Sequence, residues 1–75
     1  MVEVHAFATL KKHLPEGGKA ELEIEPGATV DDLARRLDIP VDEVKIVMRN
    51  GRHVELRDTV QDGDRVAFFP AVGGG

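Results

Sequence analysis

Residues 29–37 read Thr-Val-Asp-Asp-Leu-Ala-Arg-Arg-Leu and give the clearest helical signal in the sequence. Four of them are apolar and recur at the spacing i, i+3, i+4 and i+7, which places them on one face of an α-helix: Val30, Leu33, Ala34 and Leu37. Thr29 is a good N-cap, and Asp32 can complete a capping box with it. Pro40 stops the helix shortly afterwards. We therefore predict one amphipathic helix over about residues 29–38.

Two predicted strands precede this helix. Val2–Ala8 and Ala20–Glu25 both alternate apolar and polar residues with a period of two, as half-buried strands do. The Pro-Glu-Gly-Gly run at residues 15–18 between them is a turn signal. These segments are expected to form a β-hairpin.

Three further strands are predicted after the helix. Val44–Arg49 and His53–Leu56 enclose Asn50-Gly51, the dipeptide best suited to a tight hairpin turn, because both positions tolerate positive φ. Arg65–Phe69 forms the last strand. Its alternation puts Val66 and Phe68 on one face of the sheet and Ala67 and Phe69 on the other.

The order hairpin, helix, short hairpin and final strand predicts an α+β fold. A single helix of this length can cover one face of a mixed sheet of four to five strands. The first and last strands can lie parallel at the centre, because the helix supplies the crossover that parallel pairing needs. This arrangement is the β-grasp, or ubiquitin-like, architecture. We assign residues 1–70 to that domain and residues 71–75 to a flexible glycine-rich tail.

The composition excludes several classes of function. The sequence of 75 residues has room for one core, and its net charge of −4 argues against nucleic-acid binding. Without cysteine it forms no disulfide, thiolate metal site or thiol nucleophile. The three histidines are too scattered to indicate a metal site. No apolar run approaches a membrane span, and the first residues lack the pattern of a secretory signal, so a cytoplasmic protein is expected.

The end of the sequence, Ala71-Val72-Gly73-Gly74-Gly75, carries little side-chain bulk. Five extended residues reach roughly 17 Å, enough to enter the active site of another protein. Without Cβ atoms, Gly73 and Gly74 can pass through a narrow channel toward a nucleotide. A terminal carboxylate on Gly75 can attack an ATP phosphate, and the resulting anhydride is open to sulfur or an amine. A frayed chain end is the alternative interpretation.

Phe69 is predicted to face outward beside this tail, because Val66 and Phe68 supply the core. An exposed aromatic side chain there can anchor a partner protein, together with Pro70 and Val72. The alternative is that Phe69 only packs against a neighbouring strand.

Three segments resemble one known family. They are Phe7–Leu10, Gly27–Leu33 leading into the helix, and Asp62–Pro70, where Asp-Gly-Asp-Arg-Val-Ala-Phe-Phe-Pro precedes the glycines. Each is similar to the corresponding part of molybdopterin synthase small subunits. Together they resemble the MoaD/ThiS family of ubiquitin-like sulfur carriers over essentially the whole chain.

The resemblance implies a carrier without catalytic residues, metal or bound cofactor of its own. A ubiquitin-activating-like adenylyltransferase would adenylate Gly75, and sulfur transfer would convert the transient adenylate to a thiocarboxylate. Gly73 and Gly74 would thread into the partner. The recipient would be the large subunit of molybdopterin synthase in molybdenum or tungsten cofactor synthesis, or thiazole synthase in thiamine synthesis.

Two features of the sequence favour different branches of this family. The triple glycine after Val72 resembles the ending of thiamine carriers. The Phe68-Phe69-Pro70 segment and the long first hairpin resemble those of carriers in the molybdopterin branch. We favour the molybdopterin branch. A ubiquitin-like modifier joined through Gly75 to lysines of target proteins is the alternative from another functional class.

Overall fold

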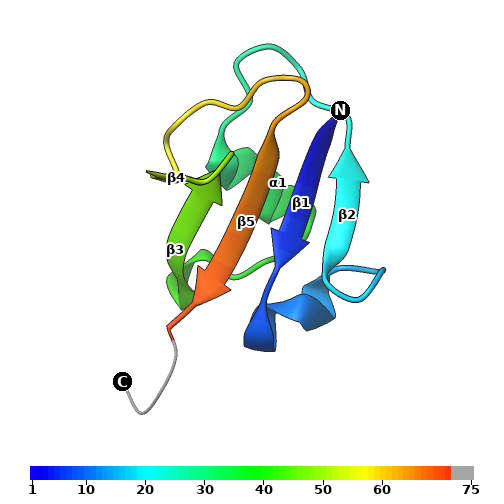
Figure 1. The fold of residues 1–75 in the computed structure, drawn as a ribbon, viewed down its shortest axis with the longest axis vertical. Coiled ribbons are helices and arrows are strands. Elements are labelled where there is room, and N and C mark those ends of the chain that lie inside the picture. The colour runs from blue at the N-terminus through cyan, green and yellow to red at the C-terminus, as the bar shows by residue number, and fades with distance from the viewer. Residues whose placement is uncertain (72–75) are drawn as a thin grey trace.

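A computed structural model describes residues 1–71. Its helices and strands follow in the order β1 (Val2–Ala6), the 3₁₀ helix η1 (Ala8–His13), β2 (Lys19–Leu22), α1 (Val30–Arg36), the 3₁₀ helix η2 (Val41–Glu43), β3 (Val44–Arg49), β4 (Arg52–Val54) and β5 (Arg65–Pro70). The five strands form one sheet in the order β2-β1-β5-β3-β4. Only the central pair, β1 and β5, is parallel. Helix α1 covers one face of the sheet (Figure 1), so the β-grasp prediction is confirmed.

Helix α1 begins with the predicted capping box. The Asp32 amide donates to Thr29 Oγ1 over 3.2 Å, and the Thr29 amide donates to Asp32 Oδ2 over 2.9 Å. These two bonds satisfy main-chain donors that the first turn leaves free. The helix ends at Arg36, two residues before the predicted end, because Asp38 adopts a left-handed conformation with φ of 56°. The Ile39 amide then folds back onto the Ala34 carbonyl over 2.9 Å.

The core lies between α1 and the covered face of the sheet. Val66 and Phe68 of β5 are fully buried there, as the alternation predicts. Of the described residues, none that is polar or charged is buried. The buried cluster consists of Val2, Val4, Ala6, Leu10, Leu14, Val30, Leu33, Ala34, Ile39, Val47, Val60, Val66 and Phe68. In residues 1–71, Figure 1 shows α1 behind the sheet and no helix in front of the opposite face, which we call the open face.

The predicted limits of the first two strands are wrong. β1 ends at Ala6 because Ala8 takes a φ of 54° and begins η1. β2 spans Lys19–Leu22, and residues 23–25 leave the sheet to run beside α1. β4 is likewise shorter than predicted. Alternation within one segment cannot show where its pairing partner ends, so it overestimates the length of each strand.

β5 extends to Pro70, one residue beyond the predicted end, and Pro70 pairs with Val44 of β3. The Phe7 amide donates to the Phe68 carbonyl over 3.2 Å, so the main chain of Phe68 faces β1. Because the direction of the main-chain groups alternates along a strand, the main chain of Pro70 also faces β1. The pairing of β1 with β5 ends at Ala6 opposite Phe68. The missing N–H of Pro70 therefore costs no ladder hydrogen bond.

Within residues 1–71, no helix combines the length and apolarity that crossing a bilayer requires.

Candidate functional site

An aromatic stack lies on the open face, at the end of β5 that leads to the glycines. The rings of Phe7 and Phe69 are 4.6 Å apart between centroids and lie within 3° of parallel. Phe7 is 42% exposed and Phe69 is half-buried. Phe69 thus faces outward, as predicted, and also packs against the residue that follows β1. The structure confirms the outward orientation of Phe69 and its packing against a neighbour, and its contact with a partner stays a prediction.

The stack belongs to a larger apolar surface. Strand pairing places Ile46 directly opposite Phe69 and Met48 opposite Ala67, and opposite residues share a face. Ile46 is 38% exposed. We call this surface the open-face patch; it comprises Phe7, Ile46, Met48, Ala67 and Phe69. Figure 1 views the sheet from this face, with α1 behind it.

A register shift in β3 turns Ile46 outward. The pairing of β3 with β5 is irregular between Val44 and Ile46. Val44 consequently packs against the core, Val47 is buried, and Ile46 and Met48 lie on the open face. A bulge of this kind changes the face on which the following side chains lie. The sequence alternates through this segment without any sign of the shift, so Ile46 and Met48 were not among the predicted contact residues.

The other half of the open face is charged. Glu3 of β1 lies 2.5 Å from His5 Nε2, 3.6 Å from Arg65 Nε and 3.9 Å from Lys19 Nζ. The hydrogen bond with His5 lowers the pKa of Glu3, and the positive charges of Arg65 and Lys19 lower it further against a partial desolvation. The His5 ring also stacks near Phe7, with centroids 6.4 Å apart. His5 therefore marks the boundary between the charged half and the open-face patch.

Glu3 should make the stability of the domain depend on pH. Its pKa is lower in the folded protein than its ordinary value of 4.5, so folding favours the carboxylate. This contribution is complete above that ordinary value and is lost as the pH falls through the lower folded pKa. We expect Glu3→Gln to reduce the loss of stability below pH 4.5 in urea unfolding measured from pH 7 to pH 3.

The matched control for that experiment is Glu16→Gln, which neutralises an exposed carboxylate in the η1–β2 turn. It should leave the acid dependence of the free energy of unfolding unchanged. Equal acid dependence in Glu3→Gln and the wild type would contradict the role given to the Glu3 cluster.

The other predicted site residues divide into two groups. Pro70 is buried at the end of β5, and Phe69 contributes to the open-face patch. Val72, Gly73, Gly74 and Gly75 lie outside the described residues. The partner contacts and tail functions assigned to these residues stay predictions. In the described part of the chain, no three His, Asp or Glu side chains are grouped closely enough to hold a metal ion.

Comparison with known proteins adds the family context. Residues 4–75 match the model of the ThiS family. No curated protein sequence matches the chain.

Solved structures with this fold include proteins of Haloferax volcanii, Pyrococcus furiosus and Helicobacter pylori. The HVO 2177 protein of Haloferax volcanii is 31% identical, with 99% of this chain and 85% of that one covered and a TM-score of 0.75. Small archaeal modifier protein 1 of H. volcanii is 26% identical, with coverage of 95% and 97% and a TM-score of 0.74. A candidate molybdopterin converting factor subunit 1 of Pyrococcus furiosus is 27% identical, with coverage of 95% and 97% and a TM-score of 0.67.

Proposed function

The chain belongs to the ThiS family of ubiquitin-like sulfur carriers, and we propose that it carries sulfur as a thiocarboxylate on Gly75. The observation that carries the proposal is the placement of the open-face patch beside the end of β5. An activating enzyme that binds Phe7, Ile46 and Phe69 would contact the chain a few residues before its glycines. The family match itself runs through Gly75.

The proposed chemistry takes place at the Gly75 carboxylate. One carboxylate oxygen attacks the α-phosphorus of ATP, pyrophosphate leaves, and an acyl adenylate forms. Hydrogen sulfide, or an equivalent sulfur nucleophile bound by the partner, then attacks the acyl carbon. AMP leaves with the carboxylate oxygen, and the thiocarboxylate remains after loss of a proton. The partner enzyme supplies the catalytic groups, and the carrier supplies an unhindered acyl group.

Intact-mass spectrometry tests this proposal. Incubation with the cognate activating enzyme, ATP and sulfide should replace one oxygen with sulfur and add about 16 Da. Omitting ATP should leave the mass unchanged. Enzyme that forms AMP in the presence of the chain but never produces the heavier species would contradict a sulfur-carrying role.

Molybdopterin synthesis is the favoured destination of the sulfur. The similarity to the candidate molybdopterin converting factor subunit 1 supports this branch, as does the Phe68-Phe69-Pro70 sequence. The partner would then be the large subunit of molybdopterin synthase. Thiocarboxylated chain should lose its extra 16 Da or so to a pterin precursor in the presence of that subunit. Sulfur transfer to thiazole synthase alone would assign the chain to the thiamine branch.

Conjugation to proteins is the second candidate function. The similarity to small archaeal modifier protein 1 favours it. In that case a lysine amine would displace AMP from the same adenylate and form an isopeptide bond. Mass spectrometry of tryptic peptides from cells would then show lysines linked to Gly75, whereas a carrier would occur only free or thiocarboxylated.

Docking of the activating enzyme should depend on the open-face patch. Phe69→Ala removes half of the stacked pair but no side chain of the buried cluster. We expect at least a tenfold increase in the Kd for the activating enzyme, which is the size of effect seen for buried aromatic anchors at interfaces. Titration calorimetry would measure it.

Arg35→Ala is the control for docking, because this exposed side chain lies on α1, away from the open face. It should bind the activating enzyme as the wild type does. Wild-type affinity of Phe69→Ala would show that the enzyme approaches another surface.

A further inference from the structure

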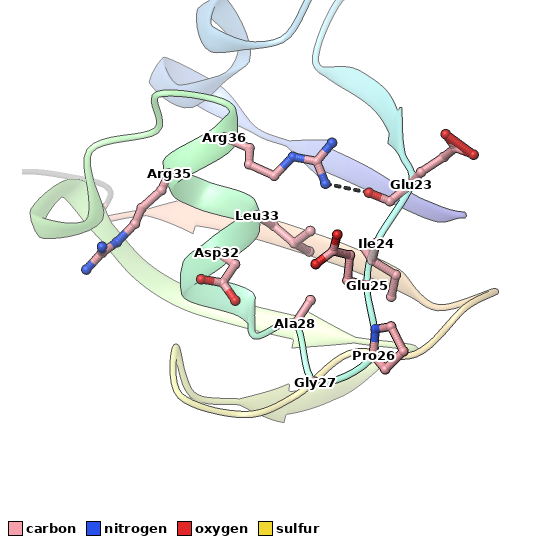
Figure 2. A pocket seen from close by; sticks show the side chains of 10 residues that line it. All are labelled: Glu23, Ile24, Glu25, Pro26, Gly27, Ala28, Asp32, Leu33, Arg35 and Arg36. Atoms are coloured by element: carbon pink, nitrogen blue, oxygen red, sulfur yellow. Dashed lines mark hydrogen bonds between the residues drawn. The ribbon is translucent and has the colours of Figure 1, made fainter.

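A groove separates the segment after β2 from helix α1. Residues 23–27 run beside the helix, and the groove between them has a volume of about 830 Å³, within the range of ligand sites. The half-buried side chains of Ile24 and Ala28 give it an apolar wall, and Leu33 beside them is fully buried in the core (Figure 2). The Glu25 side chain extends toward α1, and Asp32 lies at the start of the helix.

β2 is an outer strand of the sheet, and part of its main chain is unpaired. The Ala6 amide faces β2 and donates to the Gly18 carbonyl over 2.8 Å. The Glu3 amide faces away from β2 and donates to the Asp64 carbonyl over 3.0 Å. Hydrogen-bonded and non-hydrogen-bonded pairs alternate along an antiparallel ladder. The main-chain groups of Lys19 and Glu21 therefore point out of the sheet and are free to pair with an added strand.

The groove continues this free edge. The Arg36 guanidinium donates to the Glu23 carbonyl over 2.5 Å and fixes the segment against the helix where β2 ends. An extended peptide that pairs with Lys19 and Glu21 would continue toward the groove beside Ile24 and Ala28. Edge and groove thus form one elongated surface, separate from the open-face patch.

The charges along this surface select the occupant. Glu21, Glu23 and Glu25 are exposed, and within residues 1–71 none of them has an ion-pair partner. Of the two arginines beside the groove, Arg35 is already paired with Asp31 over 2.9 Å and Arg36 is held by the main chain. A second copy of the chain matches the surface less completely, because antiparallel pairing centred on Ala20 would set Lys19 opposite Glu21 but leave Glu23 and Glu25 without a cation, whereas a basic strand meets all three carboxylates.

We propose that this edge and groove bind an extended, basic segment of a partner protein. The segment adds to β2 as a sixth strand, with lysine or arginine side chains beside Glu21, Glu23 and Glu25. One of its apolar side chains packs in the groove against Ile24 and Ala28. Main-chain pairing gives affinity in strand addition, and the alternating side chains give specificity.

The probe is the peptide acetyl-Lys-Val-Arg-Val-Lys-Val-amide, titrated into ¹⁵N-labelled chain. We expect saturable amide shifts confined to residues 19–27 and 33–36, with binding that weakens as salt rises. The same peptide with all of its main-chain nitrogens methylated keeps the charges and loses every donor that either strand direction could use, so it should not bind. Shifts confined to the open-face patch, or equal binding of the methylated peptide, would overturn the proposal.

Two variants separate pairing from charge. In Glu21→Pro the lost N–H faces solvent, so the ladder with β1 should survive while the added strand loses a hydrogen bond. The double variant Glu23→Gln/Glu25→Gln leaves the main chain untouched. Each should raise the Kd of the peptide about tenfold or more, the latter through the loss of two charge contacts.

The matched control is Asp42→Asn/Glu43→Gln, which removes the same charge from exposed positions of η2. It should bind the peptide as the wild type does; an equal loss there would mean that the peptide senses only net charge, and the proposal would fail. All these variants should still acquire sulfur on Gly75. A result that contradicts peptide binding is thereby distinguished from one that contradicts the carrier function.

Discussion

Deletion of Gly74 and Gly75 is expected to abolish loading by the activating enzyme and to leave the melting temperature of the domain unchanged. The truncated chain still ends in a glycine carboxylate, but its reach is shorter by about 7 Å, so the carboxylate no longer meets ATP when the open-face patch is docked. Stability should persist, because the buried cluster lies between Val2 and Phe68. Mass spectrometry measures loading, and calorimetry measures the melting temperature.

The control is full-length ¹⁵N-labelled chain in the same reaction, which reports that the enzyme is active. The truncated chain should remain at its starting mass while the labelled chain gains about 16 Da. Equal loading of both species would show that the position of the carboxylate relative to the patch is unimportant. It would also remove the reason for assigning a function to the triple glycine.

Phe68→Ala is expected to unfold most of the protein at 37 °C. Phe68 is the largest of the fully buried side chains, and truncating a buried phenylalanine typically costs about 3–5 kcal/mol. A single core in a domain of this size rarely supplies more than about 3–5 kcal/mol in total. Urea unfolding at 10 °C, where a residual folded population can be followed, would measure the loss.

Phe69→Ala is the matched control, since it makes the same change one residue further along the same strand. Phe69 lies on the open face, and the loss of its stack with Phe7 should cost only about 1 kcal/mol. A similar loss of stability in both variants would contradict the assignment of the two residues to opposite faces of β5. With Phe69→Ala still folded, its weaker docking can be attributed to the open-face patch.

Much of the fold follows from local patterns. The spacing of Val30 and Leu33, the Thr29 cap and the alternation through Val66 and Phe68 each depend on residues within a few positions of one another. Such patterns predicted α1, five strands and the two faces of β5. They extended β1 and β2 too far and ended β5 too early at Phe69, because strand limits depend on neighbours that are distant in sequence.

The candidate site, like the fold, was only partly predictable from the sequence. The sequence indicated Phe69 as an outward-facing aromatic residue and identified the glycines by family resemblance. It did not indicate Phe7 or Ile46 as neighbours of Phe69. Phe7 joins it through the parallel pairing of β1 with β5, and Ile46 through a register shift in β3.

The sequence by itself determined the helix and the two faces of β5, and its resemblance to a family indicated Gly75 as the residue of the proposed chemistry. Only the tertiary structure decided which side chains surround the end of β5. It also decided that a groove beside α1 follows the β2 edge. The physical reason is the range of the interactions. Capping and alternation act over a few residues, whereas Phe7, Ile46 and Phe69 become neighbours only when three separate strands pair in one register.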